Sequence, residues 1–162
     1  MSLTSSVVDA VALLTAADQR VAFATTQFNA VTGTTGVTLT NVIGMVLTLP
    51  IGTYEFEVNL PGVATANSGA KYGFKYTTTV LTSLEATGIG HTASAAACQH
   101  TTTATDQATL YAETAAVLHT CIKGRMVVAT AGTVQLQAAQ NAAHADTTSV
   151  YVGAAMRFTK VG

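Results

Sequence analysis

A regular alternation of hydrophobic and polar residues is the feature that most limits how this chain can fold. The clearest example spans residues 54–60, where Tyr54, Phe56 and Val58 alternate with acidic and amide side chains. Successive side chains of a strand point to opposite faces, so this pattern is typical of a strand with one buried and one wet face. Residues 71–76 repeat it, with aromatic residues on one face and lysines on the other. The chain is therefore expected to fold into β-strands.

Turn signals divide residues 19–162 into about eight to ten short strands. Gly or Pro recurs at 50–52, at 61–62, where it is expected to end a strand, and at 130–132, where it is expected to close a hairpin. Short strands with turn signals at such intervals are typical of an all-β sandwich or barrel. No segment has the pattern of a crossover helix, which excludes a parallel α/β fold. One domain over residues 19–162 is expected.

Residues 1–18 differ from the rest and are expected to form an N-terminal arm. Ser5 and Ser6 could cap a short helix, because hydrophobic residues at 7, 8, 11 and 14 have helical spacing. A docking segment laid along the domain fits the same residues. Both interpretations are kept open.

Residues 83–116 carry the weakest pattern, because Ala, Thr and Gly offer little bulk to distinguish two faces. The interleaved Thr and Gly favour strand or loop over helix. We predict two short strands here and a loop around Asp106 and Gln107.

Charge suggests one strand pairing. If the strands at 54–60 and 71–76 are neighbours, Glu55 and Glu57 would lie beside Lys71 and Lys75. Opposite charges at facing positions stabilise a sheet modestly. The pairing is a hypothesis that depends on those two strands being adjacent.

The chain contains few charged residues, and this bears on its function. Asp, Glu, Lys and Arg make up 9% of the sequence, against about 25% in an ordinary soluble domain. A surface with so little charge does not keep copies apart by repulsion. The composition favours a protein covered by neighbours in an assembly, with an unusually uncharged monomer as the alternative.

Nucleic-acid binding, membrane insertion and secretion are not expected. The net charge is −1 with no basic stripe, which argues against nucleic acid. No apolar run reaches the 18 or more residues of a membrane-spanning helix. No Lys or Arg precedes Arg20, so no signal peptide is expected and the protein would be made in a cytoplasm.

Two cysteines and four histidines are the candidates for a disulfide or a metal site. A disulfide between Cys98 and Cys121 would close a loop and raise the free energy of unfolding by about 3 kcal/mol. In a reducing cytoplasm, however, two free buried thiols are expected. His100 and His119 lie two residues from these cysteines, so an in-register antiparallel pairing would gather a tetrahedral zinc set. That register needs a turn near residue 110, where turn residues are absent, so ordinary interior or interface side chains are preferred.

No catalytic constellation is recognisable. The carboxylates are scattered along the sequence, no serine lies in a G-x-S-x-G turn, and no glycine-rich phosphate loop precedes a helix. The chain contains no Trp. We expect no enzymatic activity, no cofactor and no metal.

The C-terminal third resembles a known family. It contains the run Gly132-Thr133-Val134-Gln135-Leu136-Gln137, then a polar loop and a closing segment 150–158 that includes a glycine. These resemble the last strands of tumour-necrosis-factor-like (C1q-like) jelly-roll domains of tailed-phage structural proteins. The run Leu49-Pro50-Ile51-Gly52-Thr53-Tyr54 is similar to that family's leucine-x-x-glycine-x-tyrosine entry into a central strand. Residues 83–116 depart from the family in their Ala and Thr content.

The resemblance implies a ten-strand jelly roll assembled as a compact homotrimer. It implies a virion structural protein, here a capsid decoration (cement) trimer that stabilises a bacteriophage head, with the major capsid protein as its partner. The alternative is a trimeric receptor-binding or adhesion module of a phage tail or fibre. That module would bind a host receptor through loops near 62–70 and 140–148.

Tyr151 is the one candidate for a subunit contact. It has the opposite parity to Val150 and Val152, so it is expected to face away from the core, and Tyr is enriched at interfaces. A strand buried on both faces is the alternative.

Overall fold

The computed structural model describes residues 19–30, 37–77, 80–91, 96–103, 108–113 and 116–162. The expected arm, residues 1–18, and the expected loop at Asp106 and Gln107 lie outside the described residues. The described part of the chain contains strands and no helix, as the alternation predicted. The strands are β1 (Gln19–Phe23), β2 (Phe28–Ala30), β3 (Thr40–Leu49), β4 (Gly52–Ala64), β5 (Ala70–Thr77), β6 (Val80–His91), β7 (Ala96–Thr103), β8 (Ala108–Glu113), β9 (Val117–Thr130), β10 (Gly132–Ala139), β11 (Thr148–Val150) and β12 (Ala155–Lys160).

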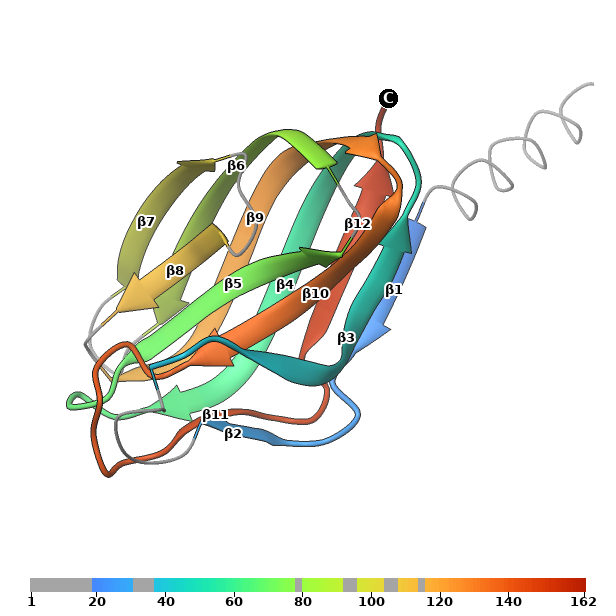
Figure 1. The fold of residues 1–162 in the computed structure, drawn as a ribbon. Helices are drawn as coiled ribbons and strands as arrows, with labels where there is room; N and C mark the ends of the chain where they lie inside the picture. Colours follow the sequence, from blue (N-terminus) through green and yellow to red (C-terminus); the bar gives the residue numbers. More distant parts are fainter. Residues whose placement is uncertain (1–18, 31–36, 78–79, 92–95, 104–107, 114–115) are drawn as a thin grey trace, which may run out of the picture.

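The strands form two antiparallel sheets that face each other (Figure 1). The larger sheet has the order β1-β12-β4-β9-β6-β7, with β11 against the end of β4 and β2 against β11. The smaller sheet has the order β3-β10-β5-β8. The fold is therefore an all-β sandwich compatible with a jelly roll. Its described strands number twelve, two of them only three residues long.

The core lies between the sheets, where the inward positions of the alternating strands meet. Phe56 and Phe158 come from the larger sheet and Phe74 from the smaller one, with ring centroids 5.3 to 5.8 Å apart. Gly124 lies opposite Phe56, and a Cβ atom there would lie 2.6 Å from the Phe56 ring. The missing side chain therefore leaves room for the aromatic cluster.

A second part of the core depends on Tyr111 of β8. Its ring lies directly over Gly88 and Gly90 of β6, where any Cβ atom would clash with it. It also stacks with Tyr72, at a centroid distance of 6.3 Å. Gly88 and Gly90 weaken the alternation in the middle of the sequence because they have no side chain. Their lack of a side chain leaves the space that the Tyr111 ring occupies.

Four details differ from the sequence-based expectations. Glu55 and Glu57 cannot face Lys71 and Lys75, because β4 and β5 belong to different sheets. Residues 130–132 do not close a hairpin, because β9 and β10 also lie in different sheets and Ala131 joins them.

The other two differences concern strand ends. β4 does not end at Pro61 but continues to Ala64, because the Pro61 carbonyl accepts a hydrogen bond from the Tyr151 N–H at 2.8 Å and the strand pairs onward with β11. The stretch 83–116 holds β7, β8 and most of β6, which is three strands where two were expected.

Candidate functional surfaces

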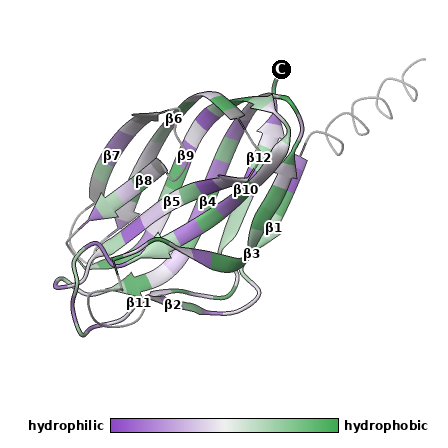
Figure 2. Ribbon diagram, viewed as in Figure 1, coloured by the Kyte–Doolittle hydropathy of each residue, from purple (hydrophilic) through white to green (hydrophobic). Residues whose placement is uncertain are grey.

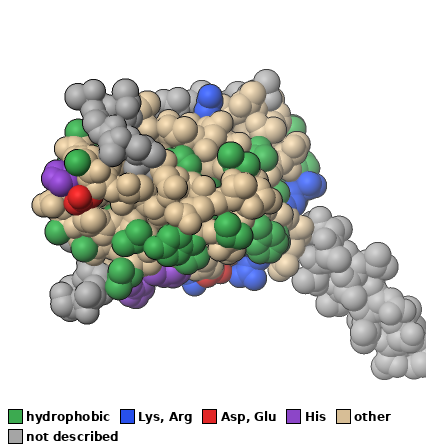
Figure 3. All heavy atoms as spheres, turned by 90° about the horizontal axis from the view of Figure 1, so that it is seen from below, with side chains coloured by type: hydrophobic (Ala, Val, Ile, Leu, Met, Phe, Trp, Pro, Cys, Tyr) green, Lys and Arg blue, Asp and Glu red, His purple; other side chains and the backbone are tan. Residues whose placement is uncertain are grey.

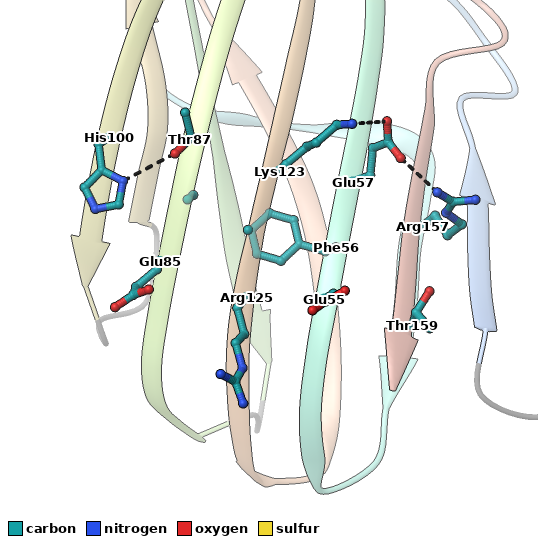
Figure 4. Close-up of a pocket in the computed structure, with 12 residues that line it drawn as sticks. Glu55, Phe56, Glu57, Glu85, Thr87, His100, Lys123, Arg125, Arg157 and Thr159 are labelled. Carbon is teal, nitrogen blue, oxygen red and sulfur yellow. Dashed lines mark hydrogen bonds and ion pairs between the residues drawn. The ribbon is translucent and has the colours of Figure 1, made fainter. Parts of the chain in front are cut away.

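A row of charged side chains crosses the outer face of the larger sheet. The strand register places Arg157 of β12, Glu57 of β4 and Lys123 of β9 side by side. Arg157 Nη2 donates to Glu57 Oε2 at 2.9 Å, and Lys123 Nζ lies 3.3 Å from Glu57 Oε1 (Figure 4). The hydrogen bond from Lys123 is the main cause that lowers the pKa of Glu57 below its usual value.

A second row runs beside the first. The register places Arg125 of β9 between Glu55 of β4 and Glu85 of β6, and no ion pair joins these three side chains. Together the two rows line a shallow pocket of about 460 Å³. They contain three acidic and three basic residues, so the pocket has no formal net charge and does not select an anion or a cation by charge alone.

Large apolar side chains are exposed along one edge of the sandwich, where β1 and β3 are the edge strands of their sheets. We use the name apolar edge for the exposed apolar residues of these two edge strands together with Val152, whose neighbour Gly153 bonds to Ala24; they are Val21, Phe23, Ile43, Val46 and Val152. Phe23, Ile43 and Val152 are 56%, 63% and 62% exposed. Figure 2 shows hydrophobic residues along β1 and the neighbouring end of β3.

Backbone hydrogen bonds hold the parts of the apolar edge together. The Thr25 N–H donates to the Ile43 carbonyl at 3.4 Å, and the Gly153 N–H donates to the Ala24 carbonyl at 3.3 Å. Gly44 has φ +85°, and a side chain there would strike the backbone of β1. The close approach of β1 and β3 therefore needs this glycine.

Tyr151, the predicted subunit contact, lies next to the apolar edge. It is 41% exposed and directly precedes Val152. The alternative of a strand buried on both faces is wrong, because Tyr151 itself is exposed. The parity argument is also wrong for Val152, which is exposed whereas Val150 is buried, because β11 ends at Val150. The chain turns here, with the Ala154 N–H donating to the Tyr151 carbonyl at 3.2 Å and Gly153 at φ +90°. Its role as a contact remains a prediction.

The tetrahedral set suggested by Cys98, His100, His119 and Cys121 does not form. β6 lies between β7 and β9, so Cys98 and Cys121 both face Ile89 from opposite sides. Both thiols are free; Cys98 is exposed and Cys121 half-buried, so the expectation of buried thiols is wrong for Cys98. The predicted zinc set required the strands of Cys98 and Cys121, β7 and β9, to be direct neighbours, and β6 separates them.

His119 has a different neighbour, which the sequence analysis missed. Its partner across the β6–β9 pair is His91. Desolvation, followed by the effect of His91, lowers the pKa of His119. No sequence signal links the two histidines, because the register between two long strands sets their pairing.

The two loops considered for recognition are bonded to each other. Asp146 accepts hydrogen bonds from Thr65 Oγ1 at 2.6 Å and Asn67 Nδ2 at 3.3 Å, and His144 Nδ1 lies 3.2 Å from it. The hydrogen bond from Thr65 is the main cause that lowers the pKa of Asp146. These polar side chains therefore fix the two loops against each other.

No protein-family model matches the chain, and no curated protein matches it. Within the described residues, no helix has the length and apolar character needed to cross a membrane.

Proposed function

We propose that this chain is a virion structural protein, a homotrimeric decoration protein that binds the major capsid protein and stabilises a bacteriophage head. The observation that carries the proposal is the apolar edge, which exposes Phe23, Ile43 and Val152 beside an already complete core. Exposed apolar patches on a folded domain mark contact surfaces. The low charge of the chain and the family resemblance of residues 124–158 support the same role.

The mechanism of such a protein is burial of surface, not chemistry. Copies would bury the apolar edge and Tyr151 against one another, and the trimer would add contacts that hold neighbouring capsid subunits together. Burial of apolar surface contributes about 25 cal/mol per Å². A stable contact of this kind needs about 1,200–2,000 Å² in total, which requires more than these six side chains.

The oligomeric state tests the first step. Light scattering coupled to size-exclusion chromatography should give the mass of a trimer for the wild-type chain and a smaller mass for Phe23→Ser. Ile51→Ser is the matched control, because Ile51 is 61% exposed but lies in the turn between β3 and β4 and is not part of the apolar edge. A monomeric wild-type protein, or a trimer insensitive to Phe23→Ser, would contradict the proposed contact.

Copy number in purified virions tests the location. Quantitative mass spectrometry, normalised to the major capsid protein, should find hundreds of copies per particle for a decoration protein. A handful of copies, in a multiple of three, would move the protein to a tail or fibre. Absence from virions would overturn the virion assignment altogether.

The alternative function is a trimeric receptor-binding or adhesion module of a tail or fibre. The hydrogen-bonded loops that contain Thr65 and Asp146 favour this function, because two loops held against each other could present a rigid recognition surface. Asp146→Ala should then reduce adsorption to host cells. Unchanged adsorption would leave the loops with a purely structural role.

Deletion of residues 1–18 tests the arm. Under the decoration model, the truncated trimer should fold but bind empty shells much more weakly in a sedimentation assay. Undiminished binding would remove the arm from the mechanism without affecting the trimer contact.

A further inference from the structure

A pair of histidines lies on the outer face of the larger sheet and has no part in the proposed assembly. His91 of β6 and His119 of β9 are direct cross-strand partners, with ring centroids 5.9 Å apart and an interplanar angle of 37°. His91 is exposed and His119 is half-buried. Figure 3 shows that histidine side chains, drawn in purple, reach the surface of the molecule.

We propose that His91 and His119 together bind one divalent transition-metal ion of the class that imidazole favours, namely Zn²⁺, Ni²⁺ or Cu²⁺. Metal–nitrogen bonds of about 2.0–2.1 Å in a tetrahedral site place the two ring centres about 5 Å apart. The observed separation of 5.9 Å is close to that value. The site requires the exposed His91 side chain to rotate so that one nitrogen of each ring reaches a common ion.

The sheet supplies the preorganisation that such a site needs. β6 and β9 stay in one register from Leu84 through His91, where His91 faces His119. Facing side chains in an antiparallel pair have Cβ atoms about 4.5–5.5 Å apart. The two ligands are therefore brought together by folding, and a metal ion need not order the backbone.

The number of ligands defines the kind of site. Among the described residues, no group of three or more His, Cys, Asp or Glu side chains is placed to hold a metal ion. Two imidazoles leave coordination positions for water or for a donor from another molecule, as in an open site. Such a site should prefer Cu²⁺ over Ni²⁺ and should not bind Mg²⁺, which selects oxygen ligands.

Calorimetric titration of the tag-free chain with Ni²⁺, and separately with Zn²⁺, tests the site. These ions are the probes because they do not oxidise the free thiols. The wild-type chain should bind one ion per chain, and His91→Asn and His119→Asn should each weaken binding at least tenfold. His100→Asn is the matched control, an exposed histidine on the same face that lies opposite Thr87, and it should leave the affinity unchanged.

A second measurement separates metal binding from folding. Ni²⁺ should raise the melting temperature of the wild-type chain, since an ion that binds only the folded state stabilises it, and should not raise that of His91→Asn. Equal binding by wild type and His91→Asn would overturn the site, and so would loss of binding in Cys121→Ser alone. This test is independent of the trimer, so failure of the assembly proposal does not affect it.

Discussion

The two outer faces of the sandwich use their polar side chains differently. On the larger sheet, side chains bond to one another across strands, as Glu57 does with Lys123 and Arg157. On the smaller sheet one pair of side chains also bonds across strands, since Gln137 Nε2 donates to Asn41 Oδ1 at 2.9 Å, but another side chain bonds to the backbone. Gln135 Nε2 of β10 donates to the carbonyls of Val42 and Met45, at 2.8 and 3.1 Å.

The backbone of β3 explains the difference. The pairing of β10 with β3 shifts between Gln135 and Gln137, opposite an irregular stretch of β3 around Gly44. Residues 42–45 of β3 have no partners in that register, and the Gln135 amide donates to the carbonyls of two of them, Val42 and Met45. A carbonyl left unpaired costs more than a surface ion pair contributes. The polar groups of the smaller face should therefore matter more to stability.

The largest effect should come from the core beneath both faces. Phe74→Ala removes the ring that contacts Phe56 and Phe158 across the two sheets. We expect a loss of about 3–5 kcal/mol in the free energy of unfolding, measured by urea denaturation. A loss below about 1 kcal/mol would mean that the two sheets do not pack through this cluster.

The next effect should come from the smaller face. Gln135→Ala leaves the Val42 and Met45 carbonyls without their donor, and we expect a loss of about 1–3 kcal/mol in the same assay. Gln27→Ala is a control, because the side chain of that exposed glutamine bonds, among the described residues, only to the nearby Asn29 side chain. Equal effects of both substitutions would contradict the structural role of Gln135.

The larger face should respond less. Glu57→Gln removes the ion pairs with Lys123 and Arg157, whose side chains are 66% and 52% exposed. We expect a loss of less than about 1 kcal/mol, which decreases further in high salt. Glu55→Gln is the matched control, since Glu55 makes no ion pair with any residue that the structure describes. A loss as large as that of Gln135→Ala would reverse the order of the two faces.

The smallest effect should be a dependence on pH. The folded state lowers the pKa of Glu57, so its stabilisation is complete above the unfolded pKa of about 4.3 and is lost as the pH falls through the folded value. The stability difference between wild type and Glu57→Gln should therefore shrink between pH 7 and pH 3. A constant difference across that range would show that charge is not its cause.

Local pattern was enough to assign many side chains to a face. The alternation at Tyr54, Phe56 and Val58 predicted the buried side of β4, and the aromatic alternation at 71–76 did the same for β5. Both predictions hold because side-chain direction along a strand depends only on the strand's own geometry. The alternation did not predict the faces in the middle of the chain. There, Gly88 and Gly90 are needed because Tyr111, a residue of another strand, packs directly against them.

The sequence by itself determined the all-β class, the inward faces of the strong strands and the low surface charge. Only the tertiary structure decided which strands are neighbours. It placed β6 between β7 and β9, which separated Cys98 from Cys121 and brought His91 to His119. The physical reason is that alternation is local, whereas strand order and register depend on contacts between residues far apart in the chain. Both surface sites depend on those contacts, so no single segment reveals them.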